Sequence, residues 1–177
     1  EASNLYRVLS ELHSRPISVT THIREEPVGV MIYGRPGQGK SLLTTMLTRR
    51  VGELRGERLT TYSQNASDDY MSGYDGQYVH IIDDFLQNRD EADAKNVCQM
   101  ISSVPWQLNM AALHEKGMKY TSKMVVATTN RRDLMLDTLR DSTALARRFP
   151  YQIEVEARPE YKDSAGRLDM TKAIGDA

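Results

Sequence analysis

The sequence predicts an α/β fold in which a mostly parallel sheet of five strands lies between helices. Stretches typical of strands alternate with stretches typical of helices along the chain, and this alternation favours parallel strands joined by helices. Two of the strand-like stretches are apolar, one along its whole length and one until its end, as expected for strands that are buried on both faces. A glycine-rich stretch joins the first strand to the next helix.

The first half of the chain is expected to contain two helices and three strands. Apolar residues at helical spacing in 5–12 predict an amphipathic helix, and a polar connector follows it. The continuous apolar run VGVMIYG (28–34) is typical of a buried strand. Residues 39–51 place their apolar side chains on one side of a helix. The more polar RLTTYSQ (58–64) and the apolar YVHIIDD (78–84) predict the second and third strands.

The second half is expected to complete the sheet and its covering helices. Apolar residues recur at intervals of three and four in 94–101, which predicts a helix. KMVVATTN (123–130) predicts the fourth strand, DSTALARRF (141–149) a short helix, and the alternating YQIEVEA (151–157) the fifth strand. The polar stretch 160–177 is expected to be loosely ordered.

These elements divide the chain into three parts. Residues 1–27 are expected to form an N-terminal helix and connector, 28–157 the α/β core, and 158–177 a polar C-terminal segment that is cut short. A length of 177 residues suits one well-packed domain. The start at Glu1, without an initiator methionine, suggests a piece of a longer protein.

The composition limits the possible functions. Hydrophobic residues make up 40% and charged residues 27%, a profile typical of a globular protein. The net charge is −1, so any contact with nucleic acid must come from a local basic patch. Cys98 is the only cysteine, which argues against disulfides and against a cysteine-based zinc site, and no zinc is expected.

Residues 34–41, GRPGQGKS, match the phosphate-binding pattern G-x-x-x-x-G-K-[ST] between a predicted strand and a predicted helix. Glycines let successive backbone amides point into one concavity, and the helix N-terminus adds partial positive charge. Lys40 is expected to reach the β- and γ-phosphates, and the Ser41 hydroxyl to bind Mg²⁺. The alternative is a glycine-rich hairpin that matches by chance. The residues expected to bind the nucleotide are Gly34, Gly37, Gln38, Gly39, Lys40 and Ser41.

Two carboxylates end the third predicted strand. Asp83 and Asp84 are expected at the carboxyl edge of the sheet, where ligands bind in such folds. Because successive strand side chains point to opposite faces, the two acids are expected to have different roles. Asp83 is expected to hold Mg²⁺ with Ser41, and Asp84 to act as the base that polarises the attacking water. The alternative is a pair of solvated turn residues.

Asn130 ends the fourth predicted strand. If this strand lies next to the third and ends level with it, Asn130 lies beside Asp84 and can orient the hydrolytic water. The alternative role is that of a turn or cap residue. The following TTNRRD does not match the N-K-x-D guanine-reading pattern, so specificity for GTP is not indicated.

Four stretches carry a resemblance to a known family. EPVGVMIYGRPGQGKS (26–41), DGQYVHIIDDFLQN (75–88), NMAALHEKGMKYTSKMVVATTN (109–130) and RRF (147–149) resemble the motif series of the picornavirus 2C ATPases, a helicase-like family of superfamily 3. The patterns D-D-x-x-Q-N (83–88) and M-A-x-L-x-x-K-G (110–117) are much more specific to one family than a phosphate loop is. The resemblance covers about residues 26–151.

The resemblance implies a P-loop NTPase domain of AAA+ type that hydrolyses ATP as a ring, most often a hexamer, during viral RNA replication. It implies that Arg147 and Arg148 reach the γ-phosphate bound by a neighbouring subunit; the alternative is a helix C-terminus that favours positive charge. It also places the parent protein in the host cytoplasm, on the cytoplasmic face of remodelled membranes. The family's membrane-binding and oligomerising helices and its zinc-binding segment are not recognisable in this chain, and truncation accounts for the two missing helices.

Basic residues precede the fourth predicted strand. In superfamily 3 the loop at this position grips nucleic acid in the central pore, which points to Lys116, Lys119 and Lys123 around Tyr120 as a site for single-stranded RNA. Arg131 and Arg132 are expected to extend this patch. The alternative is a solvated hairpin with incidental lysines.

Two function classes follow. The first is an Mg²⁺-dependent ATPase that moves RNA or remodels complexes. A host AAA+ remodelling ATPase is the runner-up within this class. It would be expected to carry a helical lid after the fifth strand, and the short polar stretch 160–177 argues against it. The second is an interaction module in which the nucleotide switches assembly, membrane recruitment or capsid binding.

Overall fold

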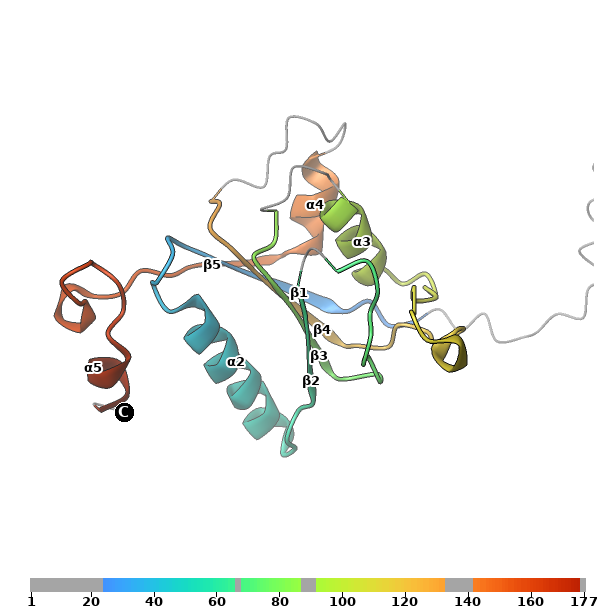
Figure 1. Ribbon diagram of the computed structural model, residues 1–177, viewed down its shortest axis with the longest axis horizontal. Coiled ribbons are helices and arrows are strands. Elements are labelled where there is room, and N and C mark those ends of the chain that lie inside the picture. The colour runs from blue at the N-terminus through green and yellow to red at the C-terminus, as the bar shows by residue number, and fades with distance from the viewer. Residues whose placement is uncertain (1–23, 66–67, 87–91, 133–141, 176–177) are drawn as a thin grey trace, which may run out of the picture.

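Five parallel strands form a single sheet with the order β2-β3-β4-β1-β5 (Figure 1). The computed structural model describes residues 24–65, 68–86, 92–132 and 142–175, and the helix predicted for 5–12 lies outside them. The strands are β1 (Val28–Tyr33), β2 (Thr61–Asn65), β3 (Val79–Asp83), β4 (Met124–Thr129) and β5 (Tyr151–Glu154). The predicted α/β class with a parallel five-stranded sheet is therefore confirmed.

Helices cover both faces of the sheet. The α-helices are α2 (Lys40–Arg55), α3 (Ala92–Met100), α4 (Ser142–Arg148) and α5 (Met170–Gly175), and the 3₁₀ turns are η1 (Leu113–Glu115) and η2 (Pro159–Tyr161). Figure 1 shows α2 on one face and α3 with α4 on the other.

The core follows the period of two that strands impose on their side chains. On the α2 face, Val30 and Ile32 of β1 pack in one apolar cluster with Leu43 and Leu47 of α2. Met31, between them in the sequence, belongs to a second cluster with Val97 of α3 and Leu145 of α4. All six residues of β4 are buried, because this strand lies in the middle of the sheet and is covered on both faces.

The fifth strand is shorter and more exposed than expected. Its burial does not alternate: Tyr151, Gln152 and Glu154 are exposed and Ile153 is half-buried. β5 lies at the edge of the sheet and pairs only with β1 among the described strands. An edge strand has less of its surface covered. Apolar and polar residues therefore alternate in its sequence, but buried and exposed residues do not alternate in the structure.

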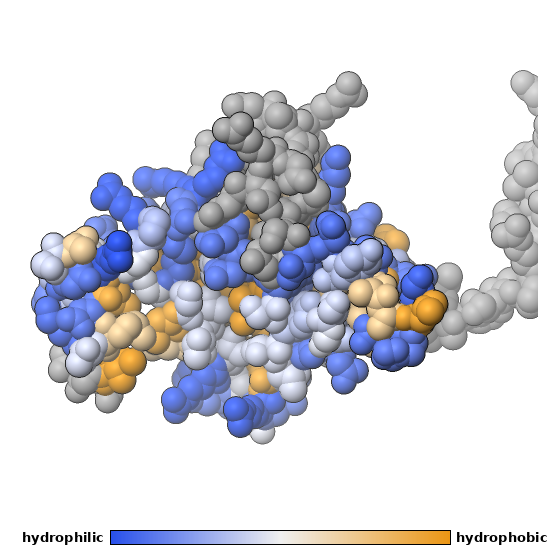
Figure 2. Space-filling model, in the orientation of Figure 1, coloured by the Kyte–Doolittle hydropathy of each residue, from blue (hydrophilic) through white to orange (hydrophobic). Residues whose placement is uncertain are grey.

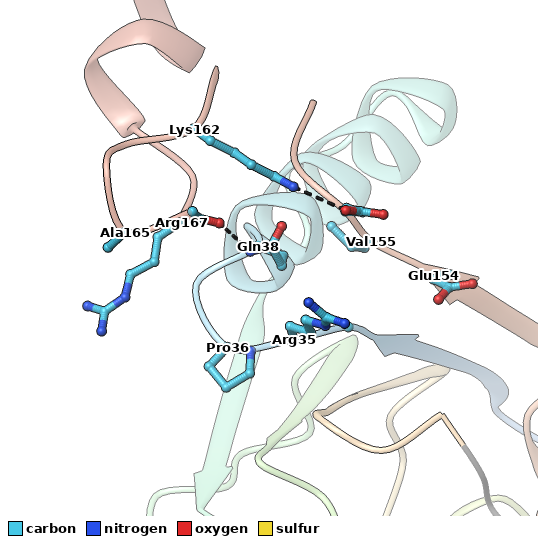
Figure 3. A pocket seen from close by; sticks show the side chains of 11 residues that line it. Arg35, Pro36, Gln38, Glu154, Val155, Lys162, Ala165 and Arg167 are labelled. Carbon is cyan, nitrogen blue, oxygen red and sulfur yellow. Dashed lines mark hydrogen bonds and ion pairs between the residues drawn. The ribbon is translucent and has the colours of Figure 1, made fainter. Parts of the chain in front are cut away.

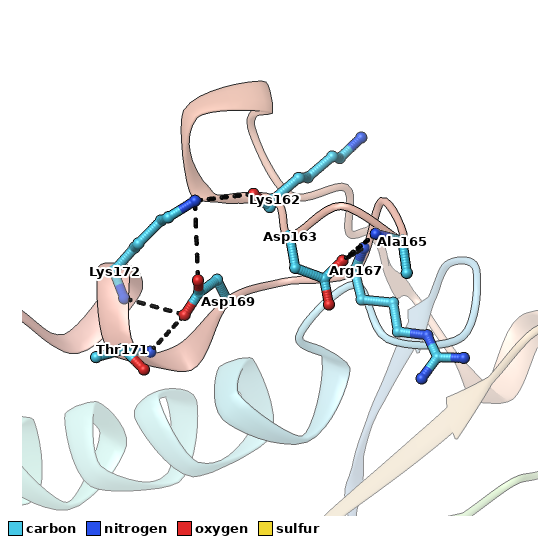
Figure 4. A network of polar contacts seen from close by, with 7 residues as sticks. All are labelled: Lys162, Asp163, Ala165, Arg167, Asp169, Thr171 and Lys172. Carbon is cyan, nitrogen blue, oxygen red and sulfur yellow. Dashed lines mark hydrogen bonds and ion pairs between the residues drawn. The ribbon is translucent and has the colours of Figure 1, made fainter.

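The expectation of a loosely ordered C-terminal stretch is wrong for the part that is described. Figure 4 shows a network of hydrogen bonds in this segment, between residues 162 and 172. The Asp163 carboxylate accepts hydrogen bonds from the amides of Ala165 and Arg167, both at 2.9 Å. The Asp169 carboxylate accepts one from the amide of Thr171 at the start of α5. Hydrogen bonds to backbone amides of Lys172 and Thr171 lower the pKa of Asp169.

An aromatic cluster is buried under the α3 face of the sheet. It contains Tyr62, Tyr74 and Tyr120 around His80. The Nδ1 atom of His80 lies 3.0 Å from the hydroxyl of Tyr120, and its Nε2 atom is buried without a hydrogen-bond partner among the described residues. Burial lowers the pKa of His80 to about 3.

The surface in Figure 2 is largely hydrophilic, with hydrophobic residues in small separate patches. Across the described residues, no helix combines the length and the hydrophobicity that crossing a bilayer requires.

Candidate nucleotide-binding site

The phosphate loop connects the end of β1 to the start of α2. Gly37 and Gly39 have φ values of 76° and 94°, a conformation that side chains with a Cβ rarely adopt. Gly39 caps α2, and its carbonyl accepts the first helical hydrogen bond from the amide of Leu43 at 2.9 Å. The loop thus turns the N-terminus of α2, with its unpaired amides and partial positive charge, toward the carboxyl edge of the sheet.

A cleft of ≈ 530 Å³ opens at this edge. Side chains from the phosphate loop, from the turn after β3 and from the end of β4 line it together. The predicted residues that line it are Gly37, Gly39, Lys40, Ser41, Asp83, Asp84 and Asn130. The strand order explains why these three segments lie together, because β4 lies between β1 and β3 and all three strands end at the same edge of the sheet.

Lys40 lines the cleft and is held there by three hydrogen bonds. Its Nζ donates hydrogen bonds to Oδ1 of Asn130 at 2.7 Å and to the carbonyls of Gly34 and Arg35 at 3.0 and 3.3 Å. Burial lowers the pKa of Lys40, and the negative charges of Asp84 and Asp83 oppose this effect. The ammonium group therefore faces the cleft beside two carboxylates and an amide.

The two acids do not lie on opposite faces of a strand. β3 ends at Asp83, and Asp84 begins a turn with φ of 54°. Because the chain leaves the strand there, the alternation of side chains stops and both carboxylates line the same cleft. The separate roles predicted for them cannot rest on that alternation and remain predictions.

Thr128 of β4 positions both acids, and the sequence reading missed it. Its hydroxyl donates a hydrogen bond to Oδ1 of Asp83 and accepts one from the amide of Asp84 at 3.3 Å. Its carbonyl accepts a third bond from the amide of Phe85 at 2.8 Å. The only sequence signal was a pair of threonines at the end of an apolar strand.

Gln38 points away from the cleft. Its side chain is buried, donates to the carbonyl of Gly166 at 2.9 Å and accepts from the amide of Ala157 at 3.1 Å. The carbonyl of Gly37 accepts a hydrogen bond from the amide of Leu168 at 2.7 Å. The C-terminal segment is thus bound to the phosphate loop, and its residues Leu168 and Met170 form part of the cleft wall.

The polar groups of the cleft suit a hard divalent cation. The Ser41 hydroxyl and the carboxylates of Asp83 and Asp84 are oxygen ligands of the kind Mg²⁺ prefers. Mg²⁺ usually takes one or two protein carboxylates together with water and phosphate oxygens. In the part of the chain that the structure describes, no group of three or more His, Cys, Asp or Glu side chains could hold a metal ion by itself.

Arg147 and Arg148 lie at the amino ends of the strands, opposite the carboxyl edge where the cleft opens. The backbone of Arg148 packs against Gly29 at the start of β1, where a Cβ on the glycine would collide with the arginine carbonyl. β1 spans roughly 17–20 Å at 3.3 Å per residue, so neither side chain reaches the phosphate loop of its own chain. Arg147 is exposed. Arg148 is half-buried, and its Nε has no hydrogen-bond partner within the described ranges.

The basic patch is smaller than expected. Lys116 and Lys119 are exposed near η1, and Lys123, just before β4, pairs with Glu25 at 3.2 Å. Tyr120, expected at the centre of this patch, is only 1% exposed and its hydroxyl lies against His80, so its ring is not open to stacking by bases.

Arg131 and Arg132 do not extend this patch. They follow β4, whereas the lysines precede it, so the two groups lie at opposite edges of the sheet. Arg132 lies 3.9 Å from Glu154 of β5. The expectation assumed that closeness in the sequence meant closeness in space, but an extended strand separates the two groups.

Comparisons with known proteins find relatives over most of the chain. The family model described as RNA helicase matches residues 30–131, which include the phosphate loop, both acids and Asn130. The chain is 44% identical over 179 residues to the genome polyprotein of Human parechovirus 5 (strain CT86-6760), which covers 98% of this chain and 8% of the polyprotein. It is 40% identical over 179 residues to the genome polyprotein of Ljunganvirus 1, a match that covers 98% of this chain and 8% of the polyprotein. It is 41% identical over 150 residues to the genome polyprotein of Poliovirus type 3 (strain 23127), a match that covers 85% of this chain and 7% of the polyprotein.

The chain thus spans less than a tenth of the length of these polyproteins. Among solved structures, the crystal structure of the DnaC helicase loader matches with a TM-score of 0.41 and 16% identity, covering 88% of this chain and 89% of that one.

Proposed function

Because the chain belongs to the RNA helicase family, of the picornavirus 2C type, we propose that it is the Mg²⁺-dependent ATPase domain of a ring-forming, helicase-like viral protein. Its task is to couple ATP hydrolysis to movement of RNA, or to remodelling of complexes, during replication of viral RNA. The parent protein then works in the host cytoplasm, at the cytoplasmic face of remodelled membranes.

One observation carries the proposal. Lys40, Ser41, Asp83, Asp84 and Asn130 come from three segments that are far apart in the sequence, and they line a single cleft at a helix N-terminus. Such a cleft supplies amides and an ammonium group for phosphate, oxygen ligands for a cation, and a carboxylate for a water molecule.

The geometry supports a hydrolytic reaction with separate tasks for these groups. The amides of the loop and Lys40 hold the β- and γ-phosphates. Ser41 and Asp83 would hold Mg²⁺, which would supply positive charge against the phosphate oxygens. Asp84 accepts a proton from a water molecule that Asn130 orients. The water oxygen then bonds to the γ-phosphorus as the bond to the β–γ bridging oxygen breaks, and ADP leaves with that electron pair.

The placement of Arg147 supports action in a ring. This exposed side chain lies at the sheet edge opposite its own cleft, so it is available to a cleft on a neighbouring copy. An arginine supplied by a neighbour adds roughly 10³–10⁵ in rate in the systems where it is measured. We propose a homo-oligomer, a hexamer in the full-length protein, with single-stranded RNA near Lys116, Lys119 and Lys123.

The deciding experiment is steady-state ATP hydrolysis by the longer parent protein, with and without single-stranded RNA. We expect Mg²⁺-dependent turnover that RNA changes, and none in Lys40→Ala. Binding of ATP without turnover, in an assembled protein with Mg²⁺, would favour the nucleotide-switched interaction module instead.

A further inference from the structure

An apolar groove of ≈ 520 Å³ opens at the amino end of β5. α2 lines it with Leu47 and Val51, and β1 lines it with Val28 and Val30. The first residues of β5, beginning with Tyr151, line it as well. The groove therefore lies on the face of the sheet that α2 covers, at the edge opposite the phosphate loop.

This groove differs in chemistry from the hollow at the other end of β5. Figure 3 shows that hollow, which is walled by the C-terminal segment and lined by charged side chains such as Glu154 and Lys162. Among the described residues that line the groove, only Lys123 is charged, and it pairs with Glu25 at 3.2 Å. An apolar ligand would therefore meet no unpaired charge in the groove.

The groove is open because β5 is shorter than β1. β5 begins at Tyr151, opposite Val30, so the first residues of β1 extend past it. Val28 is 48% exposed and Tyr151 is 59% exposed, whereas Val30 and Met124, which line the same groove, belong to the apolar core. An apolar surface that continues from the core to the exterior is suited to contact with another apolar segment.

The sequence contains a segment with the matching chemistry. Residues 5–12 are predicted to form an amphipathic helix, and their apolar residues recur at intervals of three and four: Leu5, Val8, Leu9 and Leu12. A helix over these residues is about 12 Å long, and the four residues of β5 span about 13 Å. Because so short a helix is marginal alone in water, it needs a surface against which to pack.

The described part of the chain begins close to the groove. The Nε of Arg24 donates a hydrogen bond to the carbonyl of Val104 at 3.0 Å, and the next residue, Glu25, pairs with Lys123 of the groove. Residues 13–23 can span up to roughly 36 Å, whereas α2, with 16 residues, is about 24 Å long. The length of the tether therefore allows residues 5–12 to reach the groove.

We propose that residues 5–12 dock as a helix in this groove, with their apolar side chains against Val28, Leu47 and Tyr151. An amphipathic helix in an apolar groove is a recurring mode of recognition. Because the segment is tethered to the domain, its effective concentration at the groove is of the order of millimolar. A second copy of the chain or another protein does not have this advantage.

Docking would hold the N-terminal segment beside α4. Pro150 and Tyr151 of the groove follow α4 and its two arginines directly in the sequence. The docked segment would join α2 to the start of β5 and cover the apolar side chains between them. The amino edge of the sheet would then carry both this segment and the arginine that is proposed to reach a neighbouring copy.

Photo-crosslinking of the full chain tests the docking. With p-benzoylphenylalanine in place of Tyr151, we expect crosslinks to residues 5–12 of the same molecule; mixing isotope-labelled and unlabelled chains distinguishes them from crosslinks between copies. The same photoreactive group in place of Leu54, an exposed residue of α2 that does not line the groove, should not reach residues 5–12. Crosslinks only to a second copy, or none to residues 5–12, would overturn the proposal.

Substitutions in the segment locate the contact. Leu9→Asp should abolish the crosslink from position 151, because burying a carboxylate in an apolar groove is unfavourable. Ser10→Asp adds the same charge one residue later, on the polar side of the predicted helix, and should keep the crosslink. Loss of the crosslink in both variants, or in neither, would overturn the docking of the apolar side.

Thermal unfolding provides a second readout. Leu9→Ser and Tyr151→Ser should each lower the melting temperature by roughly 2–4 °C. The double variant should lower it by less than the sum, because both substitutions remove the same contact. Leu9→Ser and Leu54→Ser should be additive, since these residues would not touch. Additive effects of Leu9→Ser and Tyr151→Ser would contradict the proposed contact.

Discussion

Lys40 of the phosphate loop and Asn130 at the end of β4 are hydrogen-bonded, with 2.7 Å between Nζ and Oδ1. β1 and β4 are adjacent and in register, Tyr33 opposite Thr129, so the loop after one strand meets the residue after the other. The lysine and the amide therefore occupy one point at the carboxyl edge of the sheet.

Asn130→Ala should separate binding from turnover. Lys40 keeps its hydrogen bonds to the carbonyls of Gly34 and Arg35, so ATP affinity should hold. Turnover should fall by roughly 10²–10³, as when one preorganised polar group is removed from a reacting centre. Asn96→Ala, on α3 away from the cleft, serves as the matched control. Loss of ATP binding as severe as in Lys40→Ala would assign Asn130 to holding the lysine.

The two acids should respond differently to loss of charge. Asp84→Asn should still bind Mg²⁺-ATP while hydrolysis falls by roughly 10²–10⁴, the range for losing a general base. Asp83→Asn should weaken binding of Mg²⁺-ATP itself. Titrating ATP with and without Mg²⁺, alongside turnover, measures both effects; the opposite pattern would show that the two roles are exchanged.

Replacing Lys116 and Lys119 with alanine should weaken binding of single-stranded RNA. Both side chains are exposed, and each RNA phosphate that a lysine no longer neutralises should reduce the salt dependence of log K by up to about one unit. Lys95→Ala, an exposed lysine on α3, is the control for charge alone. An unaltered salt slope in the double variant would mean that these lysines are only solvated.

Arg147 and Arg148 should behave differently. Arg147→Ala should reduce turnover and leave stability unchanged, because its side chain is exposed. Arg148→Ala should lower the melting temperature, because its side chain is half-buried beside the core. Thermal unfolding and ATP hydrolysis of an assembled protein measure both.

Action in trans has its own test. Mixing Asp84→Asn with Arg147→Ala in a protein that assembles should partly restore activity, because some interfaces pair an intact cleft with an intact arginine. Absence of recovery in mixtures shown to co-assemble would place the arginine's effect within its own subunit.

His80 should make stability depend on pH below neutrality. Its pKa is about 3 in the folded protein against an ordinary 6.5, so the unfolded chain binds its proton first as the pH falls. Stability should therefore decline from about pH 6.5 downward, by up to about 1.4 kcal/mol per pH unit, until the pH nears 3. Denaturant titrations of His80→Phe should show a shallower decline than the wild type. Identical slopes would mean that this histidine is not the titrating group.

The sequence by itself determined the chemistry of the phosphate loop and the strands that are buried on both faces. The pattern from Gly34 to Ser41 is local, so its backbone requirements and its lysine can be read from adjacent residues. The apolar runs of β1, β3 and β4 were likewise predicted, since burial on both faces demands apolar side chains. The polar ends of β3 and β4 pointed to a common edge.

The tertiary structure alone decided which distant residues meet. The strand order places Thr128 against Asp83, and the length of β4 separates Arg131 from Lys123. Periodicity shows which face of a strand is buried but not which strand lies next to it, so these partners could not be read from the chain. The burial of Tyr120 escaped prediction for the same reason.

The C-terminal segment shows most clearly which contacts cannot be predicted from the sequence. Its hydrogen bonds to the phosphate loop use the backbone atoms of Gly37, Ala157, Gly166 and Leu168, with Gln38 as the one side chain. Every non-proline residue carries the same backbone donor and acceptor, so no pattern of side chains marks such a contact in advance. Only the folded chain shows that this polar stretch forms part of the wall of the cleft beside the phosphate loop.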